Sequence, residues 1–167
     1  MNHVESRGND TASGATRQAL TFALGEEVYG VDILRVKEIR GWSPVTRIPQ
    51  SPPAVLGVLN LRGAIVPIVD LRVRFAMQSA EFNAVTVVIV LSLRTADGHR
   101  ECGIVVDAVS DVVDVPADSI RPTPALSGQA NSDFIAGLAQ VEDQMLILLD
   151  ATELLGRELL SAAAQAA

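Results

Sequence analysis

The feature that most constrains the fold of this chain is an internal repeat. A displacement of 80 positions superimposes two segments that each hold a pair of apolar runs, so that Gly57 falls on Gly137. A displacement of 73 positions superimposes an earlier pair of segments, with Gly30 on Gly103. Two copies in the same order are too few for a solenoid. We therefore expect two related halves, the second with a connection that is seven residues longer.

Alternation of apolar and polar residues predicts short strands joined by tight turns. Leu20, Phe22 and Leu24 alternate with smaller residues, which is the period of a half-buried strand, and residues 25–27 then form a turn. A second strand is expected from Val28. Residues 32–40 are expected to form a helical turn that leads into a strand, and residues 43–53, with four Pro, an irregular connection.

Three hairpins and one helix complete the predicted elements. Each hairpin is predicted from two apolar runs that are joined by a turn containing Gly or acidic residues. They join 55–61 to 64–71, 85–93 to 102–113, and 134–138 to 145–149. Leucines at helical spacing predict a helix over residues 151–166. Only six of the 167 residues are aromatic, so the core is expected to be aliphatic, and the fold a pair of small barrels or a sandwich.

Composition and charge exclude several classes of function. The formal net charge is −7 with a pI near 4.7, which argues against a duplex nucleic-acid binder and against attraction to an anionic membrane. No apolar run approaches the length of a membrane-spanning helix. The polar residues 1–18 lack the apolar core of a signal peptide, so we expect a flexible tail on a cytoplasmic protein.

Catalytic and metal-binding patterns are missing from the sequence. The chain has one Cys and two His, and it contains no phosphate-binding loop, dinucleotide fingerprint or metal-ligand spacing, so we expect no enzyme, cofactor or metal site. Cys102 is expected to be buried and inert. Asp70 and Asp150 occupy equivalent repeat positions and are expected to end a strand and cap the following segment.

The sequence leaves two classes of function as alternatives, a ligand-binding barrel and a hydrolase. A small barrel that binds an oligonucleotide or a small ligand would use Tyr29, Trp42 and the four Phe for stacking. A hydrolase would use Cys102 as its nucleophile.

Basic residues favour a surface for protein partners. Twelve of the thirteen are Arg, which binds carboxylates in a planar, bidentate manner and is enriched at interface hot spots. Arg62 lies at the apex of the predicted turn between two apolar strands, and a loop residue held by a scaffold is a typical binding device. The alternative for any single Arg is a solvated surface charge.

A series of motifs, in this order, resembles the CheW family of bacterial chemotaxis coupling proteins. The resemblance covers about residues 20–155. It is carried by Phe22-Ala23-Leu24-Gly25, Tyr29-Gly30-Val31-Asp32-Ile33, the segment from Val36 to Gly41, Gly57-Val58-Leu59-Asn60-Leu61-Arg62-Gly63, Val66-Pro67-Ile68-Val69-Asp70-Leu71-Arg72 and Gly103-Ile104-Val105-Val106-Asp107.

The resemblance implies an all-β fold of two intimately associated five-stranded barrels, SH3-like or OB-like, with a C-terminal helix. The expected domains are a tail (1–18), a CheW-like domain (19–155) and a C-terminal helix and tail (151–167). The implied function is a non-enzymatic adaptor that couples the cytoplasmic tip of transmembrane chemoreceptors to the regulatory domain of the histidine kinase CheA. Such a protein is cytoplasmic and is recruited to membrane-associated receptor arrays.

The resemblance also implies a receptor- and kinase-binding surface. By this resemblance, six residues are expected to lie on or near a groove between the barrels: Ile33, Val36, Glu38 and Ile39 of the first half and Val109 and Val112 of the second. Gly57, Arg62 and Gly63 belong to a hairpin implicated in coupling. For each Val and Ile, burial inside a barrel is the alternative, because groove and core positions look the same in a sequence. The sequence departs from the family pattern at Pro52-Pro53, in the turn at 95–100 and over the first eighteen residues.

Overall fold

The computed structural model describes residues 16–75, 77, 82–95, 98–122 and 134–155. Most of the predicted tail (residues 1–15) and the predicted helix beyond residue 155 lie outside the described residues. Strand β1 begins at Thr16, so residues 16–18, which we assigned to the tail, belong to the first strand instead. A helix begins at Ala151, as predicted, and is described as far as Leu155.

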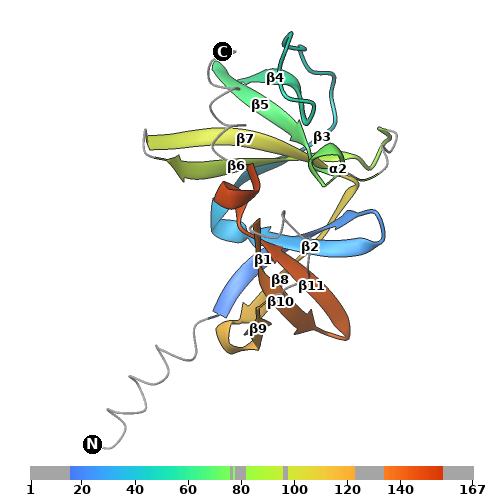
Figure 1. Cartoon of the computed structure of the whole chain (residues 1–167), viewed down its shortest axis with the longest axis vertical. Coiled ribbons are helices and arrows are strands. Elements are labelled where there is room, and N and C mark those ends of the chain that lie inside the picture. The colour runs from blue at the N-terminus through green and yellow to red at the C-terminus, as the bar shows by residue number, and fades with distance from the viewer. Residues whose placement is uncertain (1–15, 76, 78–81, 96–97, 123–133, 156–167) are drawn as a thin grey trace, which may run out of the picture.

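Two sheets, stacked one above the other, form the molecule (Figure 1). The six-stranded half has the strand order β8-β1-β2-β11-β10-β9, and the five-stranded half has the order β3-β6-β7-β5-β4. The strands of the six-stranded half are β1 (Thr16–Leu24), β2 (Glu27–Asp32), β8 (Ala108–Pro116), β9 (Ile120–Arg121), β10 (Ile135–Val141) and β11 (Gln144–Leu149). Those of the five-stranded half are β3 (Val36–Gly41), β4 (Val55–Leu61), β5 (Ala64–Asp70), β6 (Val87–Thr95) and β7 (Gly98–Val106).

This arrangement confirms the predicted all-β fold of two related halves, and one half carries an additional strand, β9, of two residues. Short helical turns connect the strands: η1 (Ile33–Arg35), α2 (Leu71–Arg74) and η2 (Ala117–Ser119). The predicted helical turn before β3 is confirmed as η1. The hairpins β4–β5 and β10–β11 are confirmed, each with a tight turn.

The predicted hairpin that joins 85–93 to 102–113 is correct only in its first part. Strand β6 pairs with β7, but the apolar run from Cys102 to Val113 is two strands rather than one. The chain leaves the five-stranded half at Asp107, whose backbone N–H donates to the carbonyl of Ala23 in the other half at 3.0 Å. The segments on both sides of Asp107 are rich in Val, and no Gly or Pro separates them, so the sequence pattern does not reveal the point where the chain changes sheets.

Strand pairing confirms the internal repeat residue by residue. Val69 faces Ile104 in the parallel pair β5–β7, and Leu149 faces Val31 in the parallel pair β11–β2. These partners are related by the displacements of 80 and 73 found in the sequence. A β-bulge also recurs, once where β3 pairs with β6 and once where β8 pairs with β1.

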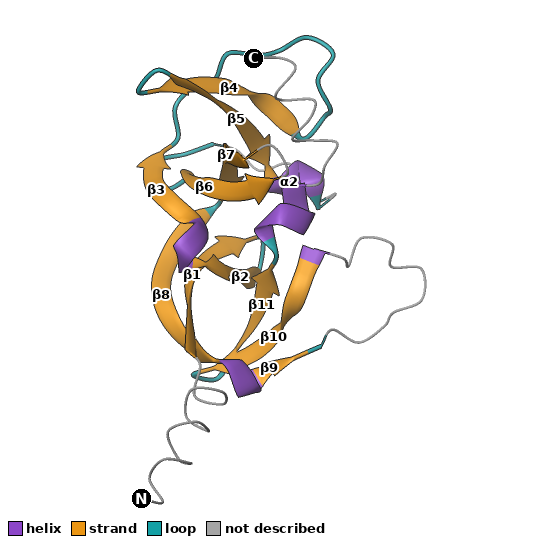
Figure 2. Cartoon of the chain, turned by 90° about the vertical axis from the view of Figure 1, so that its left-hand side faces the viewer, coloured by secondary structure: helices purple, strands orange, loops and turns teal. Residues whose placement is uncertain are grey.

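The two repeats exchange strands, so that neither half of the structure is one repeat. Strands β1 and β2 pair with β8 and β11 in the six-stranded half, whereas β3, β4 and β5 join β6 and β7 in the other. The chain crosses between the halves through η1 and again between β7 and β8. Figure 2 shows each sheet curling toward a barrel, with α2 and η1 near the level where the halves meet and η2 at the far end beside β9.

Three hydrophobic clusters account for the aliphatic composition. One cluster lies inside each half, around Val66 and Val88 in the five-stranded half and around Ala139 and Leu146 in the six-stranded half. The largest cluster lies between the halves and takes buried residues from both sheets. Strand β6 contributes to two clusters: Val88 and Val90 face one, and Ile89, Leu91 and Leu93 face the other. A strand that is buried on both faces reads as a continuous apolar run.

Each half is closed by the chain that follows its edge strand. After β3, the backbone of Thr46 exchanges hydrogen bonds of 3.0 and 2.8 Å with Val58 of β4, the strand at the opposite edge. In the other half, β9 follows β8 and pairs with β10. Both closures use a glycine, because a Cβ at Gly57 would lie 2.2 Å from the carbonyl oxygen of Thr46, and one at Gly137 would lie 2.6 Å from Ile120.

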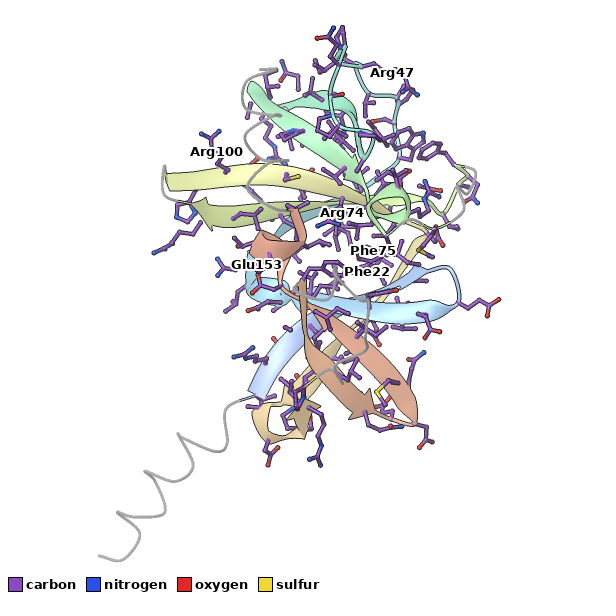
Figure 3. The ribbon with its side chains drawn as sticks, viewed as in Figure 1. Phe22, Arg47, Arg74, Phe75, Arg100 and Glu153 are labelled. Carbon is purple, nitrogen blue, oxygen red and sulfur yellow. The ribbon has the colours of Figure 1, made fainter. Side chains whose placement is uncertain are left out.

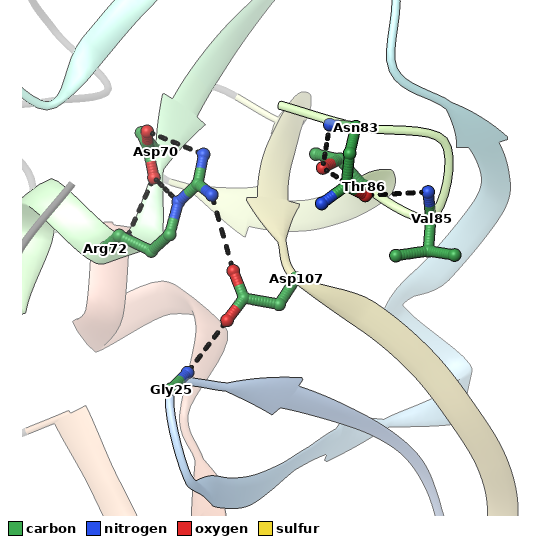
Figure 4. A network of polar contacts seen from close by, with 7 residues as sticks. All are labelled: Gly25, Asp70, Arg72, Asn83, Val85, Thr86 and Asp107. Carbon is green, nitrogen blue, oxygen red and sulfur yellow. Dashed lines mark hydrogen bonds and ion pairs between the residues drawn. The ribbon is translucent and has the colours of Figure 1, made fainter. Parts of the chain in front are cut away.

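The buried side chain of Arg72 joins the two halves (Figure 4). Its Nε and Nη2 atoms donate to the two carboxylate oxygens of Asp70 at 3.0 and 3.2 Å, and Nη1 donates to Asp107 at 3.3 Å. The other oxygen of Asp107 accepts from the backbone N–H of Gly25, in the β1–β2 turn, at 2.8 Å. Phe82 covers the guanidinium group at 4.9 Å. We call this network the Arg72 clasp.

Asp70 and Asp150 cap the segments that follow them, as predicted. The carboxylate of Asp70 accepts from the backbone N–H of Arg72 at 2.9 Å, and that of Asp150 accepts from Glu153 at 3.1 Å. Cys102 is fully buried in the shared cluster, and this burial raises the pKa of its thiol to about 12. A protonated thiol without access to solvent does not suit a nucleophile, so the hydrolase alternative does not fit the structure.

The thiol of Cys102 is expected to make stability depend on pH. Its folded-state pKa lies above the ordinary value of 9.0, so the stabilisation is complete below about pH 9 and is lost as the pH rises toward 12. The free energy of unfolding should fall by up to about 1.4 kcal/mol for each pH unit in this window. Urea unfolding between about pH 8 and pH 10 measures this slope. Cys102→Ala should lose this part of the slope, and identical slopes would contradict the assignment.

Gly57 is expected to be intolerant of a side chain. Gly57→Ala should cost about 2–3 kcal/mol of unfolding free energy, because its Cβ would collide with the backbone that closes the five-stranded half. The matched control is Gly63→Asn. Gly63 has a φ of 87° in open space, and its repeat counterpart Asp143 adopts 68°, so this change should cost less than about 1 kcal/mol. Equal losses in urea unfolding would contradict the role given to Gly57.

Candidate functional site

Strands β3 and β8 form the structural basis of the candidate site. Each is the last strand in the order of its sheet, so each pairs along one side only within the described sheets. They are counterparts in the repeat, and Figure 2 shows both along the same side of the molecule, one above the other, with η1 close to the point where the halves meet. This side therefore presents two related edge strands.

The predicted aliphatic residues divide into two groups on this side. Ile39 of β3 and Val112 of β8 are counterparts, and their side chains are 46% and 42% exposed. Ile33, Val36 and Val109 are half-buried and pack against the shared cluster. Burial inside a barrel, which the sequence left open, is therefore wrong for Ile39 and Val112, while the other three residues lie at the margin of the core. We call these five residues, together with Glu38, the edge-strand surface.

Charged residues connect the edge strands of the five-stranded half. Nη2 of Arg62, in the β4–β5 turn, donates to Oε1 of Glu38 on β3 at 2.5 Å, and Nη1 of Arg40 lies 3.4 Å from the other carboxylate oxygen. The Glu38 side chain is 20% exposed and that of Arg62 is 71% exposed. The structure therefore brings Glu38 of β3 together with Arg62 of the β4–β5 turn, with most of the Arg62 side chain in contact with solvent.

The turn that carries Arg62 has a defined geometry. Arg62 and Gly63 have φ values of 54° and 87°, which are the positive values of a type I′ hairpin turn. The side-chain oxygen of Asn60 accepts from the backbone N–H of Gly63 at 2.9 Å and fixes the turn. Gly63 is exposed beside Arg62, whereas Gly57 is buried at the closure of the half. Gly57 is thus kept apart from the exposed surface.

Several exposed aliphatic residues were not selected by the sequence analysis, among them Leu34, Ile65 and Val85. Leu34 of η1 is 86% exposed, but it lies outside the spacing of three residues that selected Ile33, Val36 and Ile39. Ile65 of β5 is also exposed, and strand alternation could have identified it, because the inward positions are Val66 and Ile68. No periodicity identifies Leu34, which is exposed because η1 crosses between the halves.

Aromatic residues do not form a platform for nucleic-acid bases. Phe22, Tyr29, Phe75 and Phe134 stack in sequence, with ring centroids 6.0, 5.5 and 4.9 Å apart, and they pack in or against the shared cluster. Figure 3 shows Phe22 and Phe75 at the level where the halves meet. Trp42 stacks on Phe82 at 4.1 Å. Five of the six aromatic residues pack in or against a hydrophobic cluster, which argues against the oligonucleotide-binding alternative.

Within the described ranges, no group of three or more His, Cys, Asp or Glu could hold a metal ion. A search of the same residues for a helix long and apolar enough to cross a membrane found none. The site therefore consists of exposed aliphatic side chains flanked by an ion pair. Such a surface suits the binding of an amphipathic helix from another protein.

Comparisons with known proteins show which family the chain resembles. A family model described as "CheW-like domain" matches residues 18–159. The chemotaxis protein CheW of Klebsiella aerogenes is 49% identical over 142 residues, which cover 85% of this chain and 83% of that protein. The chemotaxis protein CheW of Rhizobium meliloti is 40% identical over 134 residues, which cover 80% of this chain and 84% of that protein.

A solved structure extends the likeness to three dimensions. The crystal structure of the scaffolding protein TtCheW from Thermoanaerobacter tengcongensis matches with a TM-score of 0.76 at 30% identity. The match covers 87% of this chain and 96% of that chain. Family model, sequence relatives and solved structure agree over nearly the whole described fold, and this chain belongs to the CheW-like family.

Proposed function

We propose that this protein is a non-enzymatic scaffold of chemotaxis that couples receptors to the histidine kinase CheA. The observation that carries the proposal is the match to the CheW-like family over residues 18–159, together with relatives named chemotaxis protein CheW. The exposed aliphatic residues Ile39 and Val112 support the proposal, because they could take part in contacts with other proteins. The proposed function is to hold two other proteins in a productive arrangement.

The edge-strand surface is the proposed docking site for the helical tip of a receptor. Ile39 and Val112 supply an exposed aliphatic contact from each half, and the half-buried Ile33, Val36 and Val109 lie beside them. An amphipathic helix presents apolar residues at intervals of three and four, which such a surface can accept. Glu38 and Arg62 provide paired charges that fix the register of the helix.

The kinase partner is proposed to be the regulatory domain of CheA. The two halves carry related edges, so two different proteins can be held at related positions of one chain. Transient interfaces of this kind bury on the order of 1,200 Å² or less, and a micromolar affinity corresponds to about 8 kcal/mol. Multiple weak contacts in an array add avidity. The protein would reach the membrane through its receptors rather than by inserting into the bilayer.

The exposed aliphatic pair is expected to be required for docking. Ile39→Asp and Val112→Asp should each lower co-sedimentation with receptor fragments about tenfold, because each buries a charge at the contact. Both residues are exposed, so the unfolding midpoint should change little. Met145→Asp is the matched control, since Met145 is similarly exposed on β11, away from the edge strands, and this variant should bind as the wild type does. Equal loss in all three variants would contradict the assignment.

Arg62 is expected to contribute to coupling more than to stability. Arg62→Glu should reduce receptor-dependent phosphorylation by the kinase, because it removes an exposed guanidinium and places a carboxylate beside Glu38. An exposed ion pair contributes about 0–1 kcal/mol, so the thermal midpoint should fall by only a few degrees. Arg94→Glu makes the same change of charge at an exposed residue near the end of β6 and serves as the control. A large loss of stability would make Arg62 structural instead.

The proposed function itself is tested by reconstitution. Purified kinase and receptor fragments are assayed for phosphorylation with and without this protein, and the expected result is a change in kinase activity that requires all three components. If the protein left the activity unchanged and co-sedimented with neither partner, the scaffold function would be wrong.

A further inference from the structure

The two junctions between the halves are related by the internal repeat, but they are filled differently. At one junction, Arg72 lies between Asp70 and Asp107 and is 2% exposed. The displacements of 80 and 73 relate these three residues to three residues at a second junction between the halves. Their counterparts there are Thr152, Asp150 and Leu34, respectively.

The backbone supports this equivalence. The strand pairs β5–β7 and β11–β2, which lead to the two junctions, have the same parallel register. Asp70 ends β5 and Asp150 directly follows β11, and each caps the turn that comes next. The two aspartates therefore occupy the same place in the fold, although only Asp70 has an arginine two residues later.

A cavity of about 540 Å³ lies at the second junction. Asp150, Thr152, Leu34 and Asp32 are among the residues that line it. Asp150 directly follows β11, and Asp32 ends β2 beside the crossover η1; at the first junction, Asp70 ends β5 and Asp107 lies in the crossover between β7 and β8. Asp32 is not the repeat counterpart of Asp107, but it supplies a carboxylate two residues before that counterpart, Leu34. The second junction thus holds two carboxylates, while Thr152 is too short to supply the group that Arg72 supplies.

Two arginines of the chain also line the cavity, from β1 and η1. They are Arg17 and Arg35. Within the described part of the chain, no ion pair joins either of them to Asp32 or Asp150. The carboxylate of Asp32 accepts from the backbone N–H of Leu34 at 2.9 Å and that of Asp150 from Glu153, which leaves acceptor positions on both carboxylates.

We propose that this cavity receives the guanidinium group of an arginine from a partner protein, held by Asp150 and Asp32 as Arg72 is held by Asp70 and Asp107. A planar guanidinium can bind carboxylates in a bidentate manner, which an ammonium group cannot do. Leu34, beside the cavity and 86% exposed, can contact the aliphatic part of the same side chain. The proposal deepens the proposed function and rests on it for the partner, because Ile33 of the edge-strand surface also lines the cavity.

The ligand class is tested without any partner. N-acetyl-L-argininamide is titrated into the full-length protein, and the amide shifts of Asp150 and Thr152 are followed by NMR. The arginine derivative should shift these amides, whereas the citrulline derivative, its neutral isostere, should not, and Asp150→Asn should weaken the binding at least tenfold. Equal effects of the two derivatives, or shifts located elsewhere, would overturn the proposal.

A second variant copies the filled junction into the open one. Thr152→Arg should raise the thermal midpoint by about 2–4 °C and abolish binding of the arginine derivative, because its own guanidinium then occupies the cavity. Combining it with Asp150→Asn should remove the gain. Thr152→Met fills similar space without charge, and an equal gain from this control would overturn the guanidinium assignment.

The partner is tested in the reconstituted complex. Thr152→Arg should lower co-sedimentation with either the receptor fragment or the kinase at least fivefold, because the partner's arginine is excluded. If this variant co-sediments as the wild type does, the partner's arginine is ruled out and the proposed function stands. If the wild type binds neither protein, the proposed function fails, and the titration alone then decides the ligand class of the cavity.

Discussion

Packing of one sheet against the other is the interaction on which the rest of the structure depends. The cluster between the halves takes buried residues such as Leu20 and Phe22 from one sheet and Ile89 and Leu91 from the other. Burying a side chain of this size stabilises a fold by about 1.5–3 kcal/mol. A contact with this many members is a core rather than an interface between mobile domains. The positions of Ile39 and Val112 relative to each other follow from it.

Among the polar contacts around this core, the one with the most deeply buried charge is the Arg72 clasp. The Arg72 clasp connects α2, the β7–β8 crossover and the β1–β2 turn through a guanidinium that is almost fully buried. Removing one partner of a buried ion pair is far more damaging than lacking the pair altogether, since it leaves an uncompensated charge. The two junctions of the repeat have therefore diverged. Replacing Arg72 alone, to make the first junction resemble the second, would lower the stability of the fold.

Much of the fold could be predicted from the sequence because the repeat and the turns leave local signals. The pairs Gly57 with Gly137 and Gly30 with Gly103 gave the register of the two halves, and the turn at Arg62-Gly63 gave a hairpin. The exchange of strands could not be predicted, because Val-rich segments lie on both sides of Asp107 with no Gly or Pro between them to mark a turn. The solvent exposure of individual side chains could not be predicted either. Ile39 and Val36 look alike in the sequence, and only the pairing of β3 shows that Ile39 is exposed while Val36 packs against the core. Leu34 and the cavity beside it depend on a crossover between sheets that has no local signature.

The exchange of strands between repeats also affects how the chain can fold as it is synthesised. Strand β2 finds its parallel neighbour only when β11 has been made, more than a hundred residues later. The five-stranded half, whose strands are consecutive from β3 to β7, can form first. During this time the edges of β1 and β2 that later pair with β8 and β11 are unpaired. Pairings this distant in sequence are slow and leave apolar edges open to aggregation. The N-terminal hairpin is thus the segment most in need of a chaperone until the last strand arrives.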